Sequence, residues 1–178
     1  GVMLPHPSYV FQLERVYDHL FVKPGDVYLS ILPAWHSFER AVEYVLLNRA
    51  VAIAYSKPVG AVLIPDMQKT HPQWMAAVPR VWEGIRGAIY RNVKKDGGVK
   101  EVLFHFFVGV GELWCRLANR FNGLVPRYHK PNKIIDIAIT IIPLILLTPF
   151  KWLGSALVFS KLRARLGGKF IAGISGGG

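Results

Sequence analysis

The chain has a single cysteine and lacks the HExxH motif of metal-dependent hydrolysis. Cys115 stands alone, which excludes an internal disulfide and any metal site built from several cysteines. It lies in the helical pattern ELWCRLA, where we expect a small core residue rather than a nucleophile. No HExxH motif occurs, and the six histidines are scattered. We therefore predict no metal site.

Acidic residues are scarce in the last third of the chain. Residues 116–178 hold ten lysines and arginines and one acid, Asp136, whereas residues 1–115 hold 12 basic and 10 acidic residues. The net charge of +11 thus needs a local explanation. The cations alternate with aliphatic runs rather than with stacking aromatic residues, so we expect a membrane surface or helix packing and no nucleic acid.

Neither end resembles a natural terminus. The chain starts GVMLPHPS, without an initiator methionine or a secretory signal, and it stops in ISGGG. We therefore expect these 178 residues to be a fragment of a longer protein.

Strand and helix patterns alternate along most of the chain, which predicts an α/β fold with a partial parallel sheet flanked by helices. The predicted strands are Val27–Leu32, Ala50–Ala54, Gln73–Val78 and Lys169–Ile174. The predicted helices are Pro5–Phe21 with a buried stripe, one from Ser37, Val59–Met67, and Pro79 to Asp96. Ser37 is the expected N-cap of its helix, and Glu39 and Arg40 are expected either to pair or to face the site.

A helical, apolar and basic insertion is predicted at 99–168. It consists of two long helices, Val99–Phe121 and Lys133–Leu166, joined by NGLVPRYHKPN. The window Ile134–Phe150 is the most hydrophobic of the chain. Three interpretations stay open for it: a core helix, a helix lying in an anionic membrane surface, or a membrane span. The side chains expected to contact lipid are Ile134, Ile141, Leu144, Leu147, Phe150 and Trp152.

Three strand ends are expected to converge at one edge of the sheet: Pro33–Ser37, Val78–Arg80 and Ile174–Gly178. Ligands bind at the carboxyl ends of parallel strands, and a glycine-rich turn there lets backbone N–H groups approach a ligand. His36 is a candidate pocket residue, and the alternative is a hydrogen-bonded histidine in an ordinary turn.

Four segments, taken together, resemble a known family. They are GVMLPH at Gly1–His6, LSILPAWHSFERAVEY at Leu29–Tyr44, AAVPRVWEGI at Ala76–Ile85, and VFSKLRARLGGKFIAGISGGG at Val158–Gly178. In order and spacing they resemble the long-chain fatty acid–CoA ligases of the adenylate-forming, AMP-binding superfamily. The resemblance implies part of the large N-terminal domain of such an enzyme, with residues 1–178 forming a fragment of it.

The resemblance also implies an activity and a set of site residues. Such enzymes use ATP, Mg²⁺ and CoA to convert a long-chain fatty acid to an acyl-adenylate and then a thioester. By this resemblance Gly1 and Val2 lie at the edge of the phosphate loop. Trp35, His36 and Gly176–Gly178 line the acyl-adenylate pocket, with His36 as a pocket residue rather than a catalytic base.

Other motifs of the family are missing from the printed sequence, so we expect the chain alone not to turn over. They are the phosphate-loop lysine, the tyrosine-glycine-threonine-glutamate motif and the ribose-binding aspartate. The alternative function is a non-catalytic, membrane-associating helical module. The expected location is cytoplasmic, peripheral on a membrane.

Overall fold

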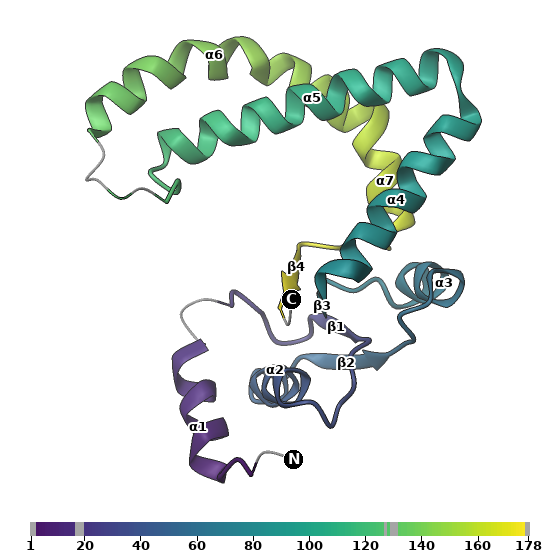
Figure 1. Ribbon diagram of the computed structural model, residues 1–178, viewed down its shortest axis with the longest axis vertical. Coiled ribbons are helices and arrows are strands. Elements are labelled where there is room, and N and C mark those ends of the chain that lie inside the picture. Colours follow the sequence, from purple (N-terminus) through teal and green to yellow (C-terminus); the bar gives the residue numbers. More distant parts are fainter. Residues whose placement is uncertain (1–2, 17–19, 127, 129–131, 177–178) are drawn as a thin grey trace. The chain divides into compact units, whose positions relative to one another are not determined.

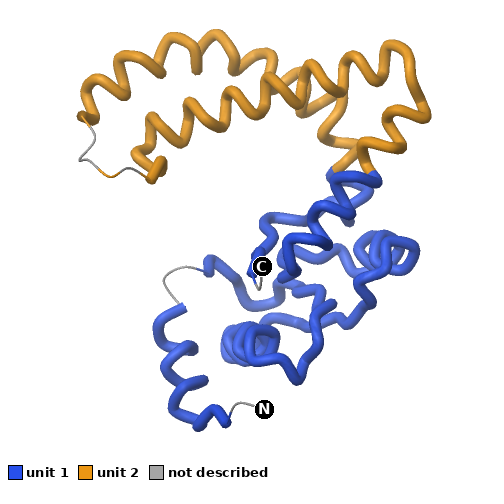
Figure 2. The backbone as a smooth tube through the Cα atoms, viewed as in Figure 1, with its two compact units in different colours: residues 1–88, 163–178 blue, residues 89–162 orange. Residues whose placement is uncertain are grey.

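The computed structural model describes residues 3–16, 20–126, 128 and 132–176, and they form two compact units. The first unit contains residues 1–88 and 163–178, and the second contains residues 89–162 (Figure 2). Helix α4 (Pro79–Asp96) runs from the first unit into the second.

The first unit is built on a four-stranded parallel sheet in the order β2-β1-β3-β4 (Figure 1). The strands are β1 (Val27–Ser30), β2 (Ala52–Tyr55), β3 (Trp74–Ala77) and β4 (Ala172–Ser175). Leu29 pairs with Ala54 on one side and with Met75 on the other, and Met75 pairs in turn with Gly173. The predicted α/β fold with a parallel sheet is confirmed.

Successive side chains of the central strands enter two separate cores because the side-chain period of a strand is two. On one face, Tyr28, Trp74 and Ala76 pack with residues of α2 (Ser37–Leu47). On the other face, Leu29, Met75 and Ala77 pack with residues of α3 (Gly60–Thr70) and with the start of α4. β1 and β3 are therefore covered on both sides, as parallel strands require.

The first helix, α1 (His6–Arg15), is shorter than the sequence pattern predicts. It ends before Leu20, which instead packs, together with Val22, against the core beneath α2. The predicted buried stripe is wrong, because α1 holds no buried residue and Val10 is 50% exposed. Tyr9 makes an edge-to-face contact with Tyr44 of α2, with ring centroids 5.5 Å apart.

The second unit is helical. Besides the end of α4 it contains α5 (Gly98–Phe121), α6 (Lys133–Gly154), the π-helical turn η2 (Ser155–Phe159) and the start of α7 (Ser160–Arg165). The two predicted long helices are thus present, and Lys133–Arg165 is one uninterrupted helical run. Cys115 is exposed on α5, so its predicted place in a core is wrong. The buried apolar side chains of α5 are instead Phe104 and Phe107.

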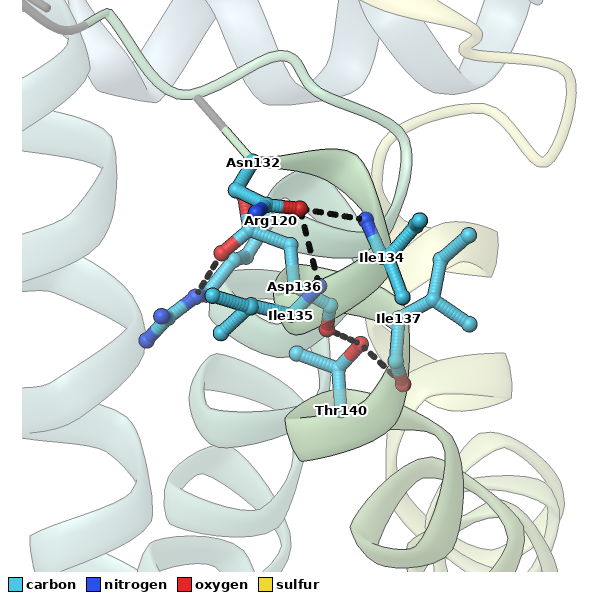
Figure 3. A network of polar contacts seen from close by, with 7 residues as sticks. All are labelled: Arg120, Asn132, Ile134, Ile135, Asp136, Ile137 and Thr140. Carbon is cyan, nitrogen blue, oxygen red and sulfur yellow. Dashed lines mark hydrogen bonds and ion pairs between the residues drawn. The ribbon is translucent and has the colours of Figure 1, made fainter. Parts of the chain in front are cut away.

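An ion pair links α5 to α6 near the connecting loop (Figure 3). Arg120 Nε donates to Asp136 Oδ1 at 2.7 Å, and Asp136 is 4% exposed. Asn132 caps α6 by accepting from the N–H groups of Ile134 and Ile135, and the Thr140 hydroxyl donates to the Asp136 carbonyl. The chain's one acid after residue 115 is thus buried and paired with a cation.

Removing that charge should loosen the α5–α6 hairpin. Asp136→Asn keeps the shape but leaves Arg120 without its ionic partner, a loss of about 1 kcal/mol for a partly exposed cation. We expect amide hydrogen exchange in α5 and α6 to become about fivefold faster. The matched control is Glu112→Gln, which neutralises an exposed carboxylate of α5. Equal exchange rates in the two variants would contradict a stabilising role for the pair.

Candidate functional site

The loop that follows β1 presents Trp35 and His36 to solvent. Trp35 is 81% exposed and His36 is also exposed. His36, not Ser37, is the N-cap of α2: its backbone is extended and its Nδ1 accepts from the Phe38 N–H at 3.3 Å. The predicted N-cap is therefore shifted by one residue. This hydrogen bond uses Nδ1 as the acceptor, so Nε2 is the ring nitrogen left to contact a ligand.

A buried carboxylate fixes the start of α2 to the sheet. Glu39 is fully buried, and it accepts from the Tyr28 hydroxyl at 3.0 Å and from the Ser30 hydroxyl at 2.6 Å. Burial, above all, raises its pKa, while the two hydroxyl hydrogen bonds lower it. Burial also raises the pKa of Tyr28, with Glu39 adding to the effect. The ion pair that was one of the two alternatives for Glu39 and Arg40 is not formed: Arg40 Nε donates to the Ala34 carbonyl at 3.4 Å.

The end of β4 lies against the first turn of α2. The Gly176 N–H donates to the Ala77 carbonyl at 3.3 Å. A Cβ on Gly176 would stand 2.9 Å from the tip of the Phe38 ring, so a larger residue there would require the ring to shift. The structure thus brings the loop containing His36 and the glycine segment together through Phe38. Gly177, Gly178, Gly1 and Val2 lie outside the described residues.

On the opposite face of β4 there is an open, mostly apolar groove of about 460 Å³. It is lined by Pro79, Trp82, Glu83, Gly173 and Ser175, from the start of α4 and from β4. A Cβ on Gly173 would lie 2.3 Å from the Trp82 ring, so the indole packs directly on bare strand backbone. The Trp82 Nε1 is buried and has no acceptor among the described residues.

The contact between Trp82 and Gly173 was not predicted from the sequence. The signal that could have found it is a glycine inside a strand pattern, Lys169–Ile174, which indicates close approach by another group. Arg80 is exposed at the start of α4, next in sequence to Pro79, which lines the groove. Within the described part of the chain no group of three histidine, cysteine or acidic side chains could hold a metal ion.

Residues 1–132 match the family model described as AMP-binding enzyme. The chain belongs to the AMP-binding enzyme family. Two relatives from Arabidopsis thaliana match all of the chain at 27% identity. They are a probable chloroplastic acyl-activating enzyme and a chloroplastic long-chain-fatty-acid–acyl-carrier-protein ligase, and the match covers 25% of each. A long-chain acyl-CoA synthetase of the same plant is 34% identical over 60% of the chain and 17% of its own length.

The AMP-binding match agrees with the resemblance found in the sequence, and the parallel sheet agrees with the fold it implies. The chain spans about a quarter of the length of the relatives that match all of it. No solved structure matches it significantly.

The Glu39 cluster makes stability depend on pH in a defined direction. A carboxyl whose pKa is higher in the folded state than its ordinary value of 4.5 favours folding most below pH 4.5. That contribution is lost as the pH rises through the folded-state pKa. Glu39→Gln should flatten this decline in urea unfolding curves measured at successive pH values upward from 4.5.

The matching truncation separates the charge from the hydrogen bonds. Glu39→Ala leaves the buried Tyr28 hydroxyl without its acceptor and the Ser30 hydroxyl with only the longer contact to Glu43 Oε1 at 3.2 Å. We therefore expect a loss of about 3 kcal/mol in the free energy of unfolding. Glu83→Ala, which truncates an exposed glutamate of α4 in the same unit, is the control. A Glu39→Ala loss no larger than that of the control would count against the cluster as the anchor of α2.

Proposed function

We propose that the chain forms part of the acyl-substrate site of an enzyme that activates fatty acids. The single observation that supports this most is the apolar groove between the start of α4 and β4, at the carboxyl side of a parallel sheet in a member of the AMP-binding family. Apolar walls bind a hydrocarbon chain, and the polar strand ends nearby suit its carboxylate.

The reaction has two steps. The fatty acid carboxylate attacks the α-phosphorus of ATP, forming acyl-adenylate and releasing pyrophosphate. A thiol then attacks the acyl carbon, forming a thioester and releasing AMP. Backbone N–H groups and a preformed pocket stabilise the charge that develops in such steps.

We assign the exposed loop after β1 and the end of β4 to the acyl-adenylate pocket at the strand ends, which is distinct from the groove on the other face of β4. Trp35 and His36 would line this pocket, with His36 Nε2 as a hydrogen-bonding group and not as a base. Gly176 would let the backbone approach the adenylate, followed by Gly177 and Gly178. Gly1 and Val2 would form the edge of the phosphate loop. Phe38 supports the assignment, since it joins the helix capped by His36 to Gly176.

ATP, Mg²⁺ and the thiol acceptor belong to the proposed enzyme as a whole. The described residues supply no set of metal ligands that fits Mg²⁺, so no step of the chemistry is assigned to such an ion here. CoA is the predicted acceptor. An acyl carrier protein is the second candidate, because one of the two relatives that match the whole chain carries that acceptor in its name. Cytoplasmic location likewise stays a prediction, since both relatives that match the whole chain are named as chloroplastic.

Filling the groove should weaken fatty acid binding. Gly173→Val places two methyl groups where the Trp82 ring packs, and overpacking of this kind costs about 1–3 kcal/mol. We expect the Kd for a fluorescent long-chain fatty acid to rise about tenfold, in titrations of the 178-residue chain. Gly60→Val, where a Cβ meets nothing within 4 Å, is the control. An unchanged Kd in Gly173→Val would place the acyl chain elsewhere.

The 178-residue chain should bind the acyl chain without turnover, because it spans about a quarter of its relatives. In a pyrophosphate-release assay with ATP, Mg²⁺, palmitate and either CoA or acyl carrier protein, we expect no signal above background. Release that depends on palmitate would overturn the expectation that this segment is inactive alone. Absence of any fatty acid binding would favour the non-catalytic alternative.

A further inference from the structure

Helix α6 and the following turn η2 have their polarity reversed. Every exposed side chain between residues 134 and 157 is apolar. Seven of the most exposed are Ile134, Ile142, Ile145, Leu146, Trp152, Leu153 and Leu157, each at 50% or more. Every polar side chain in the same range is buried or half-buried: Asp136, Thr140, Thr148, Lys151 and Ser155. A helix at a water interface shows the opposite arrangement.

The polar groups of this helix are used within the hairpin. Asp136 pairs with Arg120, and the hydroxyls of Thr140 and Thr148 donate to carbonyls one turn earlier. Trp114 Nε1 donates to the Thr148 hydroxyl at 3.2 Å, and Lys151 Nζ lies 3.3 Å from the centre of the Trp114 ring. Polar contacts between helices with apolar groups outward are what a hydrocarbon surrounding selects.

The hairpin is antiparallel, and α5, unlike residues 134–157, exposes charged and polar side chains as well as apolar ones such as Val102 and Phe106. Three contacts show the antiparallel arrangement: Arg120 meets Asp136, Trp114 meets Thr148, and Phe107 meets Gly154. Residue numbers fall along α5 as they rise along α6, so the two helices run in opposite directions. The exposed side of α5 includes Glu112, Arg116 and Asn119. These would meet hydrocarbon if the pair crossed a bilayer, at a cost that α6 alone does not impose.

Charge completes the argument. Asp136 is the one acid after residue 115, and it is neutralised inside the hairpin. Exposed lysines stand at the beginning of α6, at Lys133, and beyond its apolar face, at Lys161. Among the described residues, Lys133–Arg165 is the one helix that is apolar and long enough to cross a membrane. Its most apolar 18-residue stretch has a mean hydropathy of 2.0, and 11% of that stretch is buried. Its outer face is thus apolar, and its ends are cationic.

We propose that α6 and η2 lie in the plane of an anionic bilayer, with their apolar face in the acyl region and α5 toward water. This inference is independent of fatty acid activation. Of the predicted contacts, Ile134, Ile141, Phe150 and Trp152 belong to the exposed face. Leu144 and Leu147 are half-buried toward the hairpin, so they contribute less to the lipid contact.

Vesicle binding by the 178-residue chain tests the proposal without ATP or fatty acid. We expect co-sedimentation with vesicles of phosphatidylcholine and phosphatidylglycerol, and weaker binding to phosphatidylcholine alone. Raising the salt concentration should weaken but not abolish binding, because the apolar face is not screened. Absence of binding to both vesicles would overturn the proposal.

A charge on the proposed face should be far more damaging than one on α5. Ile145→Glu should lower the partition coefficient about tenfold or more, because a carboxylate would enter the acyl region. Leu113→Glu is the matched control: Leu113 is 48% exposed on α5, and we expect less than about twofold change there. Circular dichroism checks that both variants fold. Equal losses in the two variants would contradict the assigned face.

Trp152 reports the depth of insertion. Its fluorescence is obtained as the difference between the parent chain and Trp152→Phe. Doxyl labels near the headgroup should quench this fluorescence more than labels near the end of the acyl chain. Stronger quenching by the deep label would overturn the in-plane orientation. If the chain forms a dimer without lipid, and Ile145→Glu abolishes the dimer while vesicles do not bind, the face belongs to a second copy and the proposal fails.

Discussion

The position of the candidate site depends on the buried carboxylate of Glu39. It receives hydroxyl hydrogen bonds from Tyr28 and Ser30, two residues of β1 on the same face of the sheet. This contact fixes the first turn of α2 to the strand that precedes it. The fixed turn in turn places Phe38 against Gly176, and it sets the short loop on which Trp35 and His36 are exposed. A buried acid is costly, and here three hydroxyl-to-oxygen contacts offset part of that cost.

The sheet was predictable because its strands carry strong local signals. Apolar, β-branched runs ended by proline or glycine placed all four strands to within three residues of their observed limits. The parallel arrangement followed from helices between the strands. The strand order could not be read in the same way, because β4 pairs with β3 across nearly a hundred residues of helix. Such pairing is a property of tertiary contacts and leaves no mark in local sequence.

The convergence of the strand ends was predictable, but the contacts around them were not. The convergence of strand ends is geometric, so Gly176 and the loop after β1 were correctly expected at one edge. Three details depended on tertiary structure instead. His36 is the cap of α2 because its backbone is extended there. Glu39 turns toward the sheet rather than toward Arg40. Leu20 packs against the sheet core instead of continuing α1. The position of the Trp82 ring depends on the absence of a side chain at Gly173, which lies far from it in the sequence.

The two units of the chain satisfy opposite solvent requirements with the same residue types. In the first unit, Leu29, Met67 and Met75 are fully buried, while Arg40 of α2 and Lys69 of α3 are exposed. In the second, the acid and the threonines of α6 are buried or half-buried, and every isoleucine of α6 except Ile137 is exposed. A helix of isoleucine and leucine exposed on one entire face loses the free energy of burial unless something apolar covers it. Because the polar groups of α6 are already paired within the hairpin, that cover need supply no hydrogen bonds, which is the property that distinguishes lipid from most protein surfaces.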